Sequence, residues 1–446
     1  MITDADRRAA NDPRRARFLP YMAASRGERA GKWVSADEAV AAIKDHSRVF
    51  LAAASGTPMG LLDALASNRD RWQDMELVMA YMLRRPAVFE HAGKPFRFTT
   101  TQATPAFKYL WDTGTVSILP ARYSDLSGLF LSTGSYPVEA ALVQVSAPGP
   151  EGRVSLGTSA GGSIDITRNA PLVIAQVNDK VPYTFGASEF ELSEFDFLVD
   201  LPEPLKPAKL TDFSEDQVLQ SIAGQAAEKI ADGSTLQFGI GAIPDAILAQ
   251  LSSHKNLSVH SGMFSMACVE LLEKGVVTNT SKGFDDGYMI TAEVSNTEPM
   301  MRWIHRNPQL LMAPARYSHG AGVLGNIPRF VSLQSAIEVA LDGSVNSETV
   351  NGRVMSGPGG APDYAFAACA ATNGRSILAL KSVTGNGSIS RIVKSVEAPD
   401  RITLPCYTAD IIVTEHGVAE VRGMPFDVRA EAIRAIAHPD HQTNLK

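Results

Sequence analysis

Two stretches of the chain share one pattern, in which an apolar run leads into a turn that contains glycine and then into apolar residues at helical spacing. The first reads VFLAAASGTPMGLLDAL from Val49, and the second reads LQFGIGAIPDAILAQL from Leu236. Aligning Pro58 with Pro244 places Leu61, Leu62 and Leu65 over Ile247, Leu248 and Leu251. Strand, turn and helix in this order form the first part of a βαβ unit, whose strands are parallel. We therefore predict an α/β fold with two related halves, although two unrelated strand–turn–helix units would give the same pattern.

Further strand-like runs alternate with helical patterns on both sides of the chain's middle, which supports the α/β class. They read ELVMAYM, RVSLGTS, PLVIAQVND, LSVHSGM, SILALKSV and DIIVTEHG, and DVRAEAIRAIAHPDHQTN predicts a closing helix with a polar tail. In proteins with an open parallel sheet, the active site lies at the carboxyl ends of the strands. The strand after the second glycine turn ends in His260-Ser261-Gly262-Met263-Phe264, and residue 262 has no side chain to offer.

A chain of 446 residues exceeds the size at which a single core stops growing, so two domains are expected. The stretch DLPEPLKPAKLTD from Asp200 contains three prolines, which disfavour a continuous strand or helix. A helical pattern follows, with Ser214 as a candidate cap. We therefore place the boundary near residue 205, between domains of residues 1–205 and 206–446. The first 20 or so residues are charged and are expected on the surface or against a partner subunit.

Composition excludes several classes of protein. The formal net charge is −7 and the basic residues are scattered, so no nucleic-acid partner is expected. The sequence has no run of about 18 or more uncharged apolar residues and no signal-peptide core at its N-terminus, so neither membrane insertion nor secretion is expected. Cys268, Cys369 and Cys406 lack the spacing of a disulfide framework or a zinc site. A soluble enzyme in the reducing cytoplasm fits these features.

Several glycine-rich loops are candidates for chemistry. Gly239 and Gly241 stand between a predicted strand and a helix, where backbone N–H groups favour an anion such as a phosphate. The stretch from Gly157 to Gly161 matches the GxSxG pattern of a nucleophile elbow, but the residues after it are poor helix material, which favours chance. The loops at 357–360 and 385–387 could expose amides or simply form turns. His438 and His441 have metal-ligand spacing, but they lie in a polar tail, so no metal site is expected.

Several motifs together carry a family resemblance over nearly the whole chain. They read ALVQVSAPGPEGRVSLG, VIAQVNDKVPYTFGAS, LQFGIGAIPDAIL, VHSGMFS, RFVSLQSAIEVALDGSVNSE, SGPGGAPDY, SRIV, DIIVTEHGVAEVRG and AHPD. In order and spacing the chain resembles the acetyl-CoA hydrolase/transferase family, in its 4-hydroxybutyrate and butyryl-CoA:acetate CoA-transferase branch. The resemblance implies two related open α/β domains of the CoA-transferase type with the active site between them. It also implies acyl-CoA and a small carboxylic acid as substrates, no metal, and a homodimer or larger oligomer.

The same resemblance marks two departures. In the family, a glutamate in a (Ser/Thr)-Glu-Met-Phe motif attacks the acyl-CoA, and that place is taken here by Gly262. An asparagine that helps to hold the oxyanion is replaced by His319, while the second oxyanion donor, a backbone N–H, is retained at Gly360. The CoA-binding stretch is retained as well, at Gln237, Phe238, Gly239, Ile240, Gly241 and Ile337.

Without the glutamate, His319 is the leading catalytic candidate. A histidine could deprotonate a water held in the space that the glutamate leaves, which predicts hydrolysis of a thioester or of an activated C–C bond in an acyl-CoA. Ser261 is expected to point to the opposite face of its strand from Gly262. Glu293 is expected to be structural, and Arg316 either binds a substrate carboxylate or lies on the surface. Two alternatives stay open: a CoA-transferase that uses another carboxylate, and a non-catalytic acyl-CoA binder.

Overall fold

A computed structural model describes residues 3–207 and 215–445, and the chain divides into two compact units. Unit 1 comprises Met1–Ala208 and Thr291–Ser318, and unit 2 comprises Lys209–Ile290 and His319–Lys446. The boundary near residue 205 stays a prediction, to which the structure adds that residues 291–318 pack with the N-terminal part. The candidate helix cap Ser214 lies outside the described residues. The helix that follows is capped instead by Asp216, whose carboxylate accepts from the Leu219 N–H.

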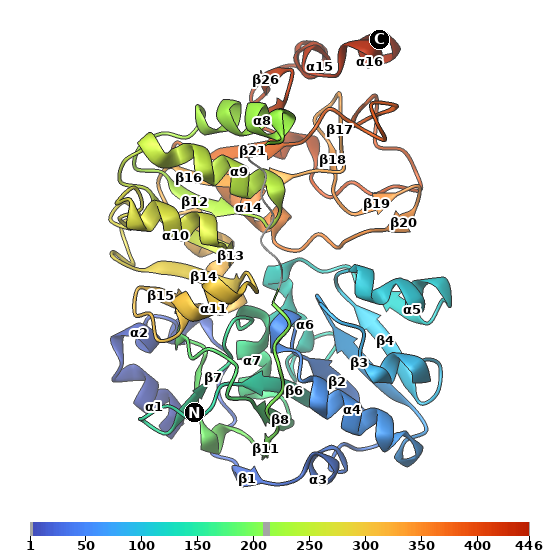
Figure 1. Ribbon diagram of the computed structural model, residues 1–446, viewed down its shortest axis with the longest axis vertical. Helices are drawn as coiled ribbons and strands as arrows, with labels where there is room; N and C mark the ends of the chain where they lie inside the picture. Colours follow the sequence, from blue (N-terminus) through green and yellow to red (C-terminus); the bar gives the residue numbers. More distant parts are fainter. Residues whose placement is uncertain (1–2, 208–214, 446) are drawn as a thin grey trace. The chain divides into compact units, whose positions relative to one another are not determined.

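Unit 1 is built on an eight-stranded sheet with the order β1-β11-β8-β6-β2-β3-β4-β5, in which every neighbouring pair is parallel (Figure 1). These strands are β1 (Lys32–Trp33), β2 (Arg48–Leu51), β3 (Met75–Met79), β4 (Phe96–Thr100), β5 (Val116–Ile118), β6 (Ala140–Val145), β8 (Leu172–Val177) and β11 (Phe197–Asp200). Two smaller pairings join β7 (Arg153–Ser155) to β10 (Glu189–Glu191) and β9 (Phe185–Gly186) to β15 (Leu310–Met312). Of the runs predicted as strands in this unit, ELVMAYM overlaps β3 and PLVIAQVND contains β8 of the parallel sheet, whereas RVSLGTS contains β7, which pairs antiparallel with β10.

The helices of unit 1 are α1 (Asp4–Ala10), α2 (Pro13–Ala16), α3 (Ala36–Val40), α4 (Met59–Ser67), α5 (Lys108–Asp112), α6 (Leu126–Phe130), α7 (Gly161–Asn169), α11 (Glu298–Ile304) and α12 (Ala315–Ser318). Leu61, Leu62 and Leu65 of α4 are fully buried in a core that they share with β2, β3 and β4. The apolar stripe used to align the two halves is thus the face that holds α4 on the sheet.

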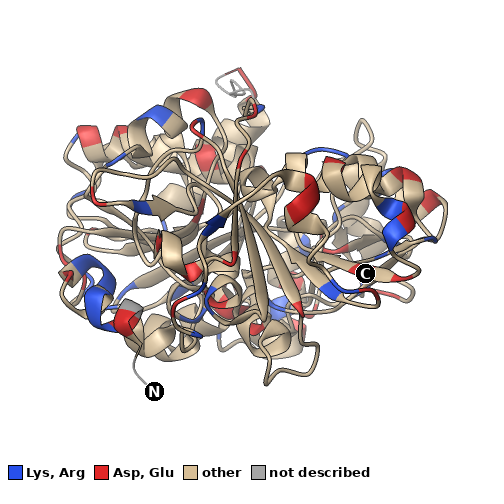
Figure 2. Ribbon diagram, turned by 90° about the horizontal axis from the view of Figure 1, so that it is seen from below, with Lys and Arg blue, Asp and Glu red and all other residues tan. Residues whose placement is uncertain are grey.

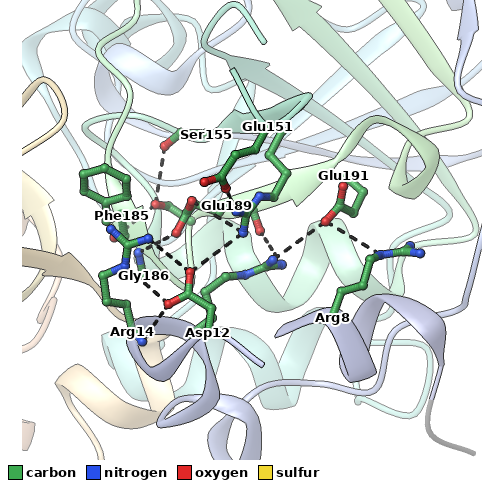
Figure 3. Close-up of polar contacts among 12 residues, drawn as sticks. Arg8, Asp12, Arg14, Glu151, Ser155, Phe185, Gly186, Glu189 and Glu191 are labelled. Carbon is green, nitrogen blue, oxygen red and sulfur yellow. Dashed lines mark hydrogen bonds and ion pairs between the residues drawn. The ribbon is translucent and has the colours of Figure 1, made fainter. Parts of the chain in front are cut away.

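The N-terminal segment is docked on unit 1 by a mixed ionic cluster (Figure 3). The Arg15 guanidinium is buried and donates to the Glu189 carbonyl at 3.1 Å. Arg14 pairs with Asp12 at 3.2 Å, and its guanidinium lies 4.3 Å from the centre of the Phe185 ring. These residues are therefore part of the unit rather than a free surface arm.

Unit 2 contains a sheet with the strand order β26-β25-β21-β16-β12-β13, parallel except at its β25–β26 edge. Its strands are β12 (Thr235–Phe238), β13 (Ser258–Phe264), β16 (Phe330–Ser335), β21 (Arg375–Ala379), β25 (Ile411–Thr414) and β26 (Gly417–Glu420). Shorter strands are β17 (Glu338–Ala340), β18 (Val345–Asn346), β19 (Thr349–Val350), β20 (Arg353–Val354), β22 (Val383–Thr384), β23 (Ile389–Ser390) and β24 (Ile392–Val393). Strand β14 (Met289–Val294) spans the point where the chain passes from unit 2 to unit 1.

The helices of unit 2 are α8 (Gln217–Ala227), α9 (Ala242–Gln250), α10 (Met266–Glu273), α13 (Ala321–Leu324), α14 (Ala361–Ala370), α15 (Phe426–Ala435) and α16 (Pro439–Gln442). Helices α8 and α9 pack side by side (Figure 1). The closing helix predicted near the C-terminus is α15. One core cluster contains Phe330 of β16 and Tyr364 of α14, and Tyr364 is part of the candidate site described below.

The two sheets share a strand order that supports the predicted duplication. In unit 1, β3 neighbours β2, which is followed across the sheet by β6 and β8. In unit 2, β13 neighbours β12, which is followed by β16 and β21. All of these pairs are parallel. The α/β fold class is therefore confirmed, and the aligned stretches occupy equivalent places in the two sheets.

Charged residues of both signs are interspersed over the ribbon in Figure 2. Within residues 3–207 and 215–445, no helix combines the length and the apolar character that crossing a membrane requires.

Candidate active site

The glycine turn of unit 2 keeps an open backbone at the start of a helix. Strand β12 ends at Phe238, and Gly241 caps α9 with a φ of 125°, a conformation that favours glycine. A Cβ at Gly241 would meet nothing within 4 Å, and Ile240 is 52% exposed. Backbone N–H groups at a helix start attract anions, so this turn can receive a phosphate.

Hydrogen bonds from neighbouring strands fix the residues that lead into the turn. The side-chain carbonyl oxygen of Gln237 accepts from Ser332 Oγ and from Gln334 Nε2, both at 2.8 Å. Ser261 Oγ accepts from the Phe238 N–H and donates to the Phe238 carbonyl, both at 3.1 Å. The Ser261 hydroxyl therefore ties β13 to β12, which excludes it as a freely directed nucleophile.

The structure brings Gly262, His319 and Gly360 together. A Cβ added at residue 262 would lie 2.6 Å from His319 Nε2, and one added at residue 360 would lie 2.5 Å from His319 Cδ2. The imidazole is buried, with 3% of its residue surface exposed, and it fills the space beside both glycines. The expectation of an open, water-filled space at residue 262 is therefore wrong, because His319 occupies that space.

Tyr364 also belongs to this cluster and was missed by the sequence analysis. Its hydroxyl lies 2.7 Å from the place of a Cβ on Gly262, and its ring centre lies 4.6 Å from that of His319. Tyr364 stands on α14 one turn after Gly360, where its N–H donates to the Gly360 carbonyl at 3.1 Å. This helical spacing from Gly360 was the signal in the sequence that could have pointed to it.

Burial sets the protonation states of the two rings. Burial, followed by the neighbouring His260, holds the pKa of His319 well below its usual range. Burial, followed by the Asp363 carboxylate, raises the pKa of Tyr364 well above its usual range. At neutral pH the imidazole is therefore uncharged and can accept a proton, while the phenol keeps its proton and can donate a hydrogen bond.

The other loops have simpler roles. Ile337 is half-buried, and its N–H donates to the Asn346 carbonyl at 2.9 Å. The loop at 357–360 leads into α14. The loop at 385–387 is the turn of the β22–β23 hairpin, and all three of its residues have positive φ. It is therefore a tight turn, as one of the two interpretations expected.

The GxSxG segment does precede a helix, contrary to the sequence-based expectation. Helix α7 starts at Gly161 and is buried along most of its length, so tertiary packing outweighs the poor helix propensity of its glycines. Ser159 is buried and forms a bridge with Glu293 through the backbone. The order of strand and helix therefore resembles an elbow.

Glu293 lies in a polar cluster of unit 1. The Tyr123 hydroxyl donates to Glu293 Oε1 at 2.6 Å and accepts from the Gly162 N–H at 2.9 Å. Burial raises the pKa of Glu293 to about 7, against the opposing effect of Ser159 and Tyr123. This carboxyl therefore changes its charge near neutral pH. Arg316 lies 3.9 Å from the buried Asp165 carboxylate and is 43% exposed at its side chain.

Two further features bear on ligand binding, a surface groove and the possible metal ligands. A surface groove of about 710 Å³ on unit 1, lined in part by Lys180, Glu203, Arg302 and His305, contains none of the predicted site residues. Among the described residues, no group of three or more His, Cys, Asp or Glu side chains is arranged to hold a metal ion. His441 Nε2 instead lies 2.8 Å from the Gly387 carbonyl.

The packing of His319 predicts that a side chain at residue 262 destabilises the fold. Gly262→Ala should lower the free energy of unfolding by about 1–3 kcal/mol, as overpacked cores do. The penalty should shrink in a His319→Ala background, and a double-mutant cycle measured by urea unfolding would give the coupling. Gly224→Ala is the control, because a Cβ there meets nothing within 4 Å and should stabilise α8 by about 1 kcal/mol. Equal penalties for Gly262→Ala in both backgrounds would contradict the packing.

The raised pKa of Glu293 predicts a pH dependence of stability. Because the folded-state pKa of about 7 exceeds the ordinary value of 4.5, the folded state binds more protons between these values. The contribution is fully present below pH 4.5 and is lost as the pH rises through about 7. Glu293→Gln should remove this loss, as measured by urea unfolding at several pH values. Glu298→Gln, at an exposed side chain, is the control. An unchanged pH profile in Glu293→Gln would show that Glu293 ionises normally.

Comparison with known proteins covers both parts of the chain. Residues 22–207 match the acetyl-CoA hydrolase/transferase N-terminal domain, and residues 297–446 match the C-terminal domain of the same family. The chain is 34% identical to the 4-hydroxybutyrate coenzyme A transferase of Clostridium kluyveri over 93% of this chain and 96% of that protein.

Two further similarities agree with this match. The acetyl-CoA hydrolase of Eremothecium gossypii is 25% identical over 85% of this chain and 76% of its own length. The structure of RipA from Yersinia pestis matches with a TM-score of 0.85 at 25% identity, over 93% of this chain and 96% of that one. The relatives thus include a transferase and a hydrolase, and the chain is an enzyme that belongs to the acetyl-CoA hydrolase/transferase family.

Proposed function

We propose that this enzyme hydrolyses the thioester of an acyl-CoA, with His319 as the base that activates water. The observation that carries the proposal is the position of the imidazole, which fills the place of a residue-262 side chain between Gly262 and Gly360. The resemblance assigns the nucleophile to that place, and a glycine offers none. A neutral imidazole can take a proton from water, whereas covalent exchange through residue 262 is impossible without a side chain there.

Coenzyme A is the cosubstrate that the family implies, and the turn at residues 239–241 suits it. The open space at Gly241 and the exposed Ile240 leave room for a phosphate or for an extended chain beside the start of α9. Gln237 and Phe238 hold the turn in place through the bonds described above. Ile337 and Gly360 complete the set of residues that we assign to CoA binding.

The proposed reaction conserves every atom. A water oxygen forms a bond to the thioester carbonyl carbon as His319 takes one of its protons. The C–S bond then breaks, and the CoA thiolate takes the proton from His319. The products are a carboxylic acid and free CoA. The Gly360 N–H stabilises the negative charge on the carbonyl oxygen. The same base could act on an activated C–C bond of an acyl-CoA.

A second candidate is CoA transfer to a small carboxylic acid through a carboxylate other than residue 262. The Clostridium kluyveri relative, which is named a transferase, favours it. A third is acyl-CoA binding without catalysis. We further propose a cytoplasmic homodimer or larger oligomer, and the three cysteines, all free in the structure, fit a reducing compartment.

Thiol release from acyl-CoA esters tests the proposal. We expect the protein to release free thiol without any added acid, and His319→Ala to lower kcat by about 10²- to 10⁴-fold, the usual contribution of a general base. His254→Ala, at a half-buried histidine bonded to the Ile230 carbonyl, should leave the rate unchanged. Because the pKa of His319 is depressed, the rate should stay level from pH 8 down through about 6.5 and fall only in stronger acid.

Three outcomes would separate the candidates. Release that requires an acceptor acid supports transfer. Binding of acyl-CoA without any release supports the non-catalytic binder. A rate that is insensitive to His319→Ala removes His319 from the mechanism.

Restoring the family's nucleophile gives an independent test of the residue assignment. Gly262→Glu alone should yield little folded protein, because a side chain at 262 would collide with His319 and Tyr364. Gly262→Glu combined with His319→Asn should relieve part of that collision and form a glutamyl-CoA thioester, detected by mass after borohydride treatment. Gly262→Gln with His319→Asn is the control, since an amide cannot form the adduct. If the Gly262→Glu, His319→Asn double variant folds but forms no adduct, residue 262 does not face the thioester.

A further inference from the structure

Tyr364 is held rigidly at the predicted site. Its ring packs against Phe330, with ring centres 6.2 Å apart, inside a cluster that also contains Leu324 and Ile327. Only 2% of the residue surface is exposed. The N–H of Tyr364 bonds to the Gly360 carbonyl at 3.1 Å, so the ring is fixed relative to that glycine. A ring held in this way can place its hydroxyl in one position.

The hydroxyl of Tyr364 and the imidazole of His319 converge on one place. Both the Tyr364 oxygen and His319 Nε2 lie within 2.7 Å of the position that a Cβ on Gly262 would take. The edge of the Tyr364 ring lies 2.9 Å from the corresponding position on Gly360. The backbones of Gly262 and Gly360 are half-buried, whereas the two rings are nearly covered. Both polar groups therefore lie on the side of Gly262 toward which a side chain would project.

The two groups are complementary in their hydrogen bonding. Burial keeps the phenol protonated, so it donates, and it keeps the imidazole neutral, so one of its nitrogens accepts. Thioester hydrolysis needs one acceptor for the water proton and at least one donor for the carbonyl oxygen. The resemblance assigns a side-chain amide donor to position 319, and a neutral imidazole that serves as the base cannot fill that role at the same nitrogen. With His319 acting as the base, the Gly360 N–H is the one donor left of the pair that the resemblance implies, and the place of a second donor is open.

We propose that the Tyr364 hydroxyl is this donor and forms a hydrogen bond to the acyl carbonyl oxygen of the bound thioester. As water adds to the carbonyl carbon, the C=O π electrons move to oxygen, and the hydrogen bond from Tyr364 strengthens without transferring its proton. When the C–S bond breaks, the C=O bond re-forms and the hydrogen bond weakens again. The effect of Tyr364 on the rate rests on the proposed hydrolysis. The hydrogen bond between Tyr364 and the carbonyl oxygen can be detected by binding alone, without turnover.

The kinetic test uses Tyr364→Phe, which removes only the hydroxyl oxygen. We expect kcat to fall by about 10²- to 10³-fold, as on removal of one oxyanion donor, with little change in KM for acyl-CoA. Tyr183→Phe is the matched control, because it also removes a buried hydroxyl, one that donates to Glu189 at 2.8 Å, and should leave kcat unchanged. Urea unfolding of both variants shows whether either has lost its fold. A folded Tyr364→Phe variant with full kcat overturns the proposal.

The binding test uses ketone analogues of acetyl-CoA and butyryl-CoA in which a methylene group replaces the thioester sulfur and the carbonyl carbon carries ¹³C. A hydrogen bond to the carbonyl oxygen moves its ¹³C resonance downfield. We expect a downfield shift on binding to the wild-type protein that is reduced in Tyr364→Phe and retained in Tyr183→Phe. An equal shift in both variants overturns the role of Tyr364, even if the wild type hydrolyses thioesters. A shift lost only in Tyr364→Phe, in a protein that releases no thiol, supports Tyr364 and refutes hydrolysis. Failure of both analogues to bind refutes both proposals.

Discussion

The close approach of one imidazole to two glycine backbones governs the proposed site. His319 lies so near residues 262 and 360 that a Cβ at either would stand 2.5 to 2.6 Å from its ring. Non-bonded carbon and nitrogen atoms do not approach so closely, so a side chain at 262 requires the imidazole of His319 to shift from its place. The two departures that the resemblance implies, glycine at 262 and histidine at 319, are therefore coupled by packing, because the ring takes the space that a side chain at 262 would need.

The sequence predicted the parts of the fold that depend on local patterns. The apolar runs beginning at Val49 and Leu236 became β2 and β12 of parallel sheets, and the helices after them bury the aligned apolar residues. Helix α7 was missed because local propensity opposes it, and only the surrounding core, formed by residues distant in sequence, stabilises it. Propensity is a weak guide wherever tertiary burial is nearly complete.

At the candidate site, the motifs predicted three residues that lie close together in the structure, but not how these residues fill space. Motif positions identified Gly262, His319 and Gly360, and the structure brings these three together. The void expected at residue 262 does not exist, because a missing side chain leaves a cavity only if nothing else can move into it. Tyr364 was not found because a tyrosine in an apolar helix has the same pattern as any core residue. Its spacing of one helical turn from Gly360 and its distance to Gly262 distinguish it from other core residues.

Burial also sets the protonation states of the two side chains that pack beside Gly262. In water an imidazole is partly protonated near neutral pH, but the enclosed ring of His319 stays neutral, and the enclosed phenol of Tyr364 stays protonated. An acceptor and a donor thus face the same backbone without either carrying a charge. A low pKa also makes His319 a weaker base than an exposed histidine, because proton transfer to it has less driving force. For the proposed reaction these uncharged groups suit water as the attacking molecule, because water carries no charge before it reacts, whereas a carboxylate nucleophile does.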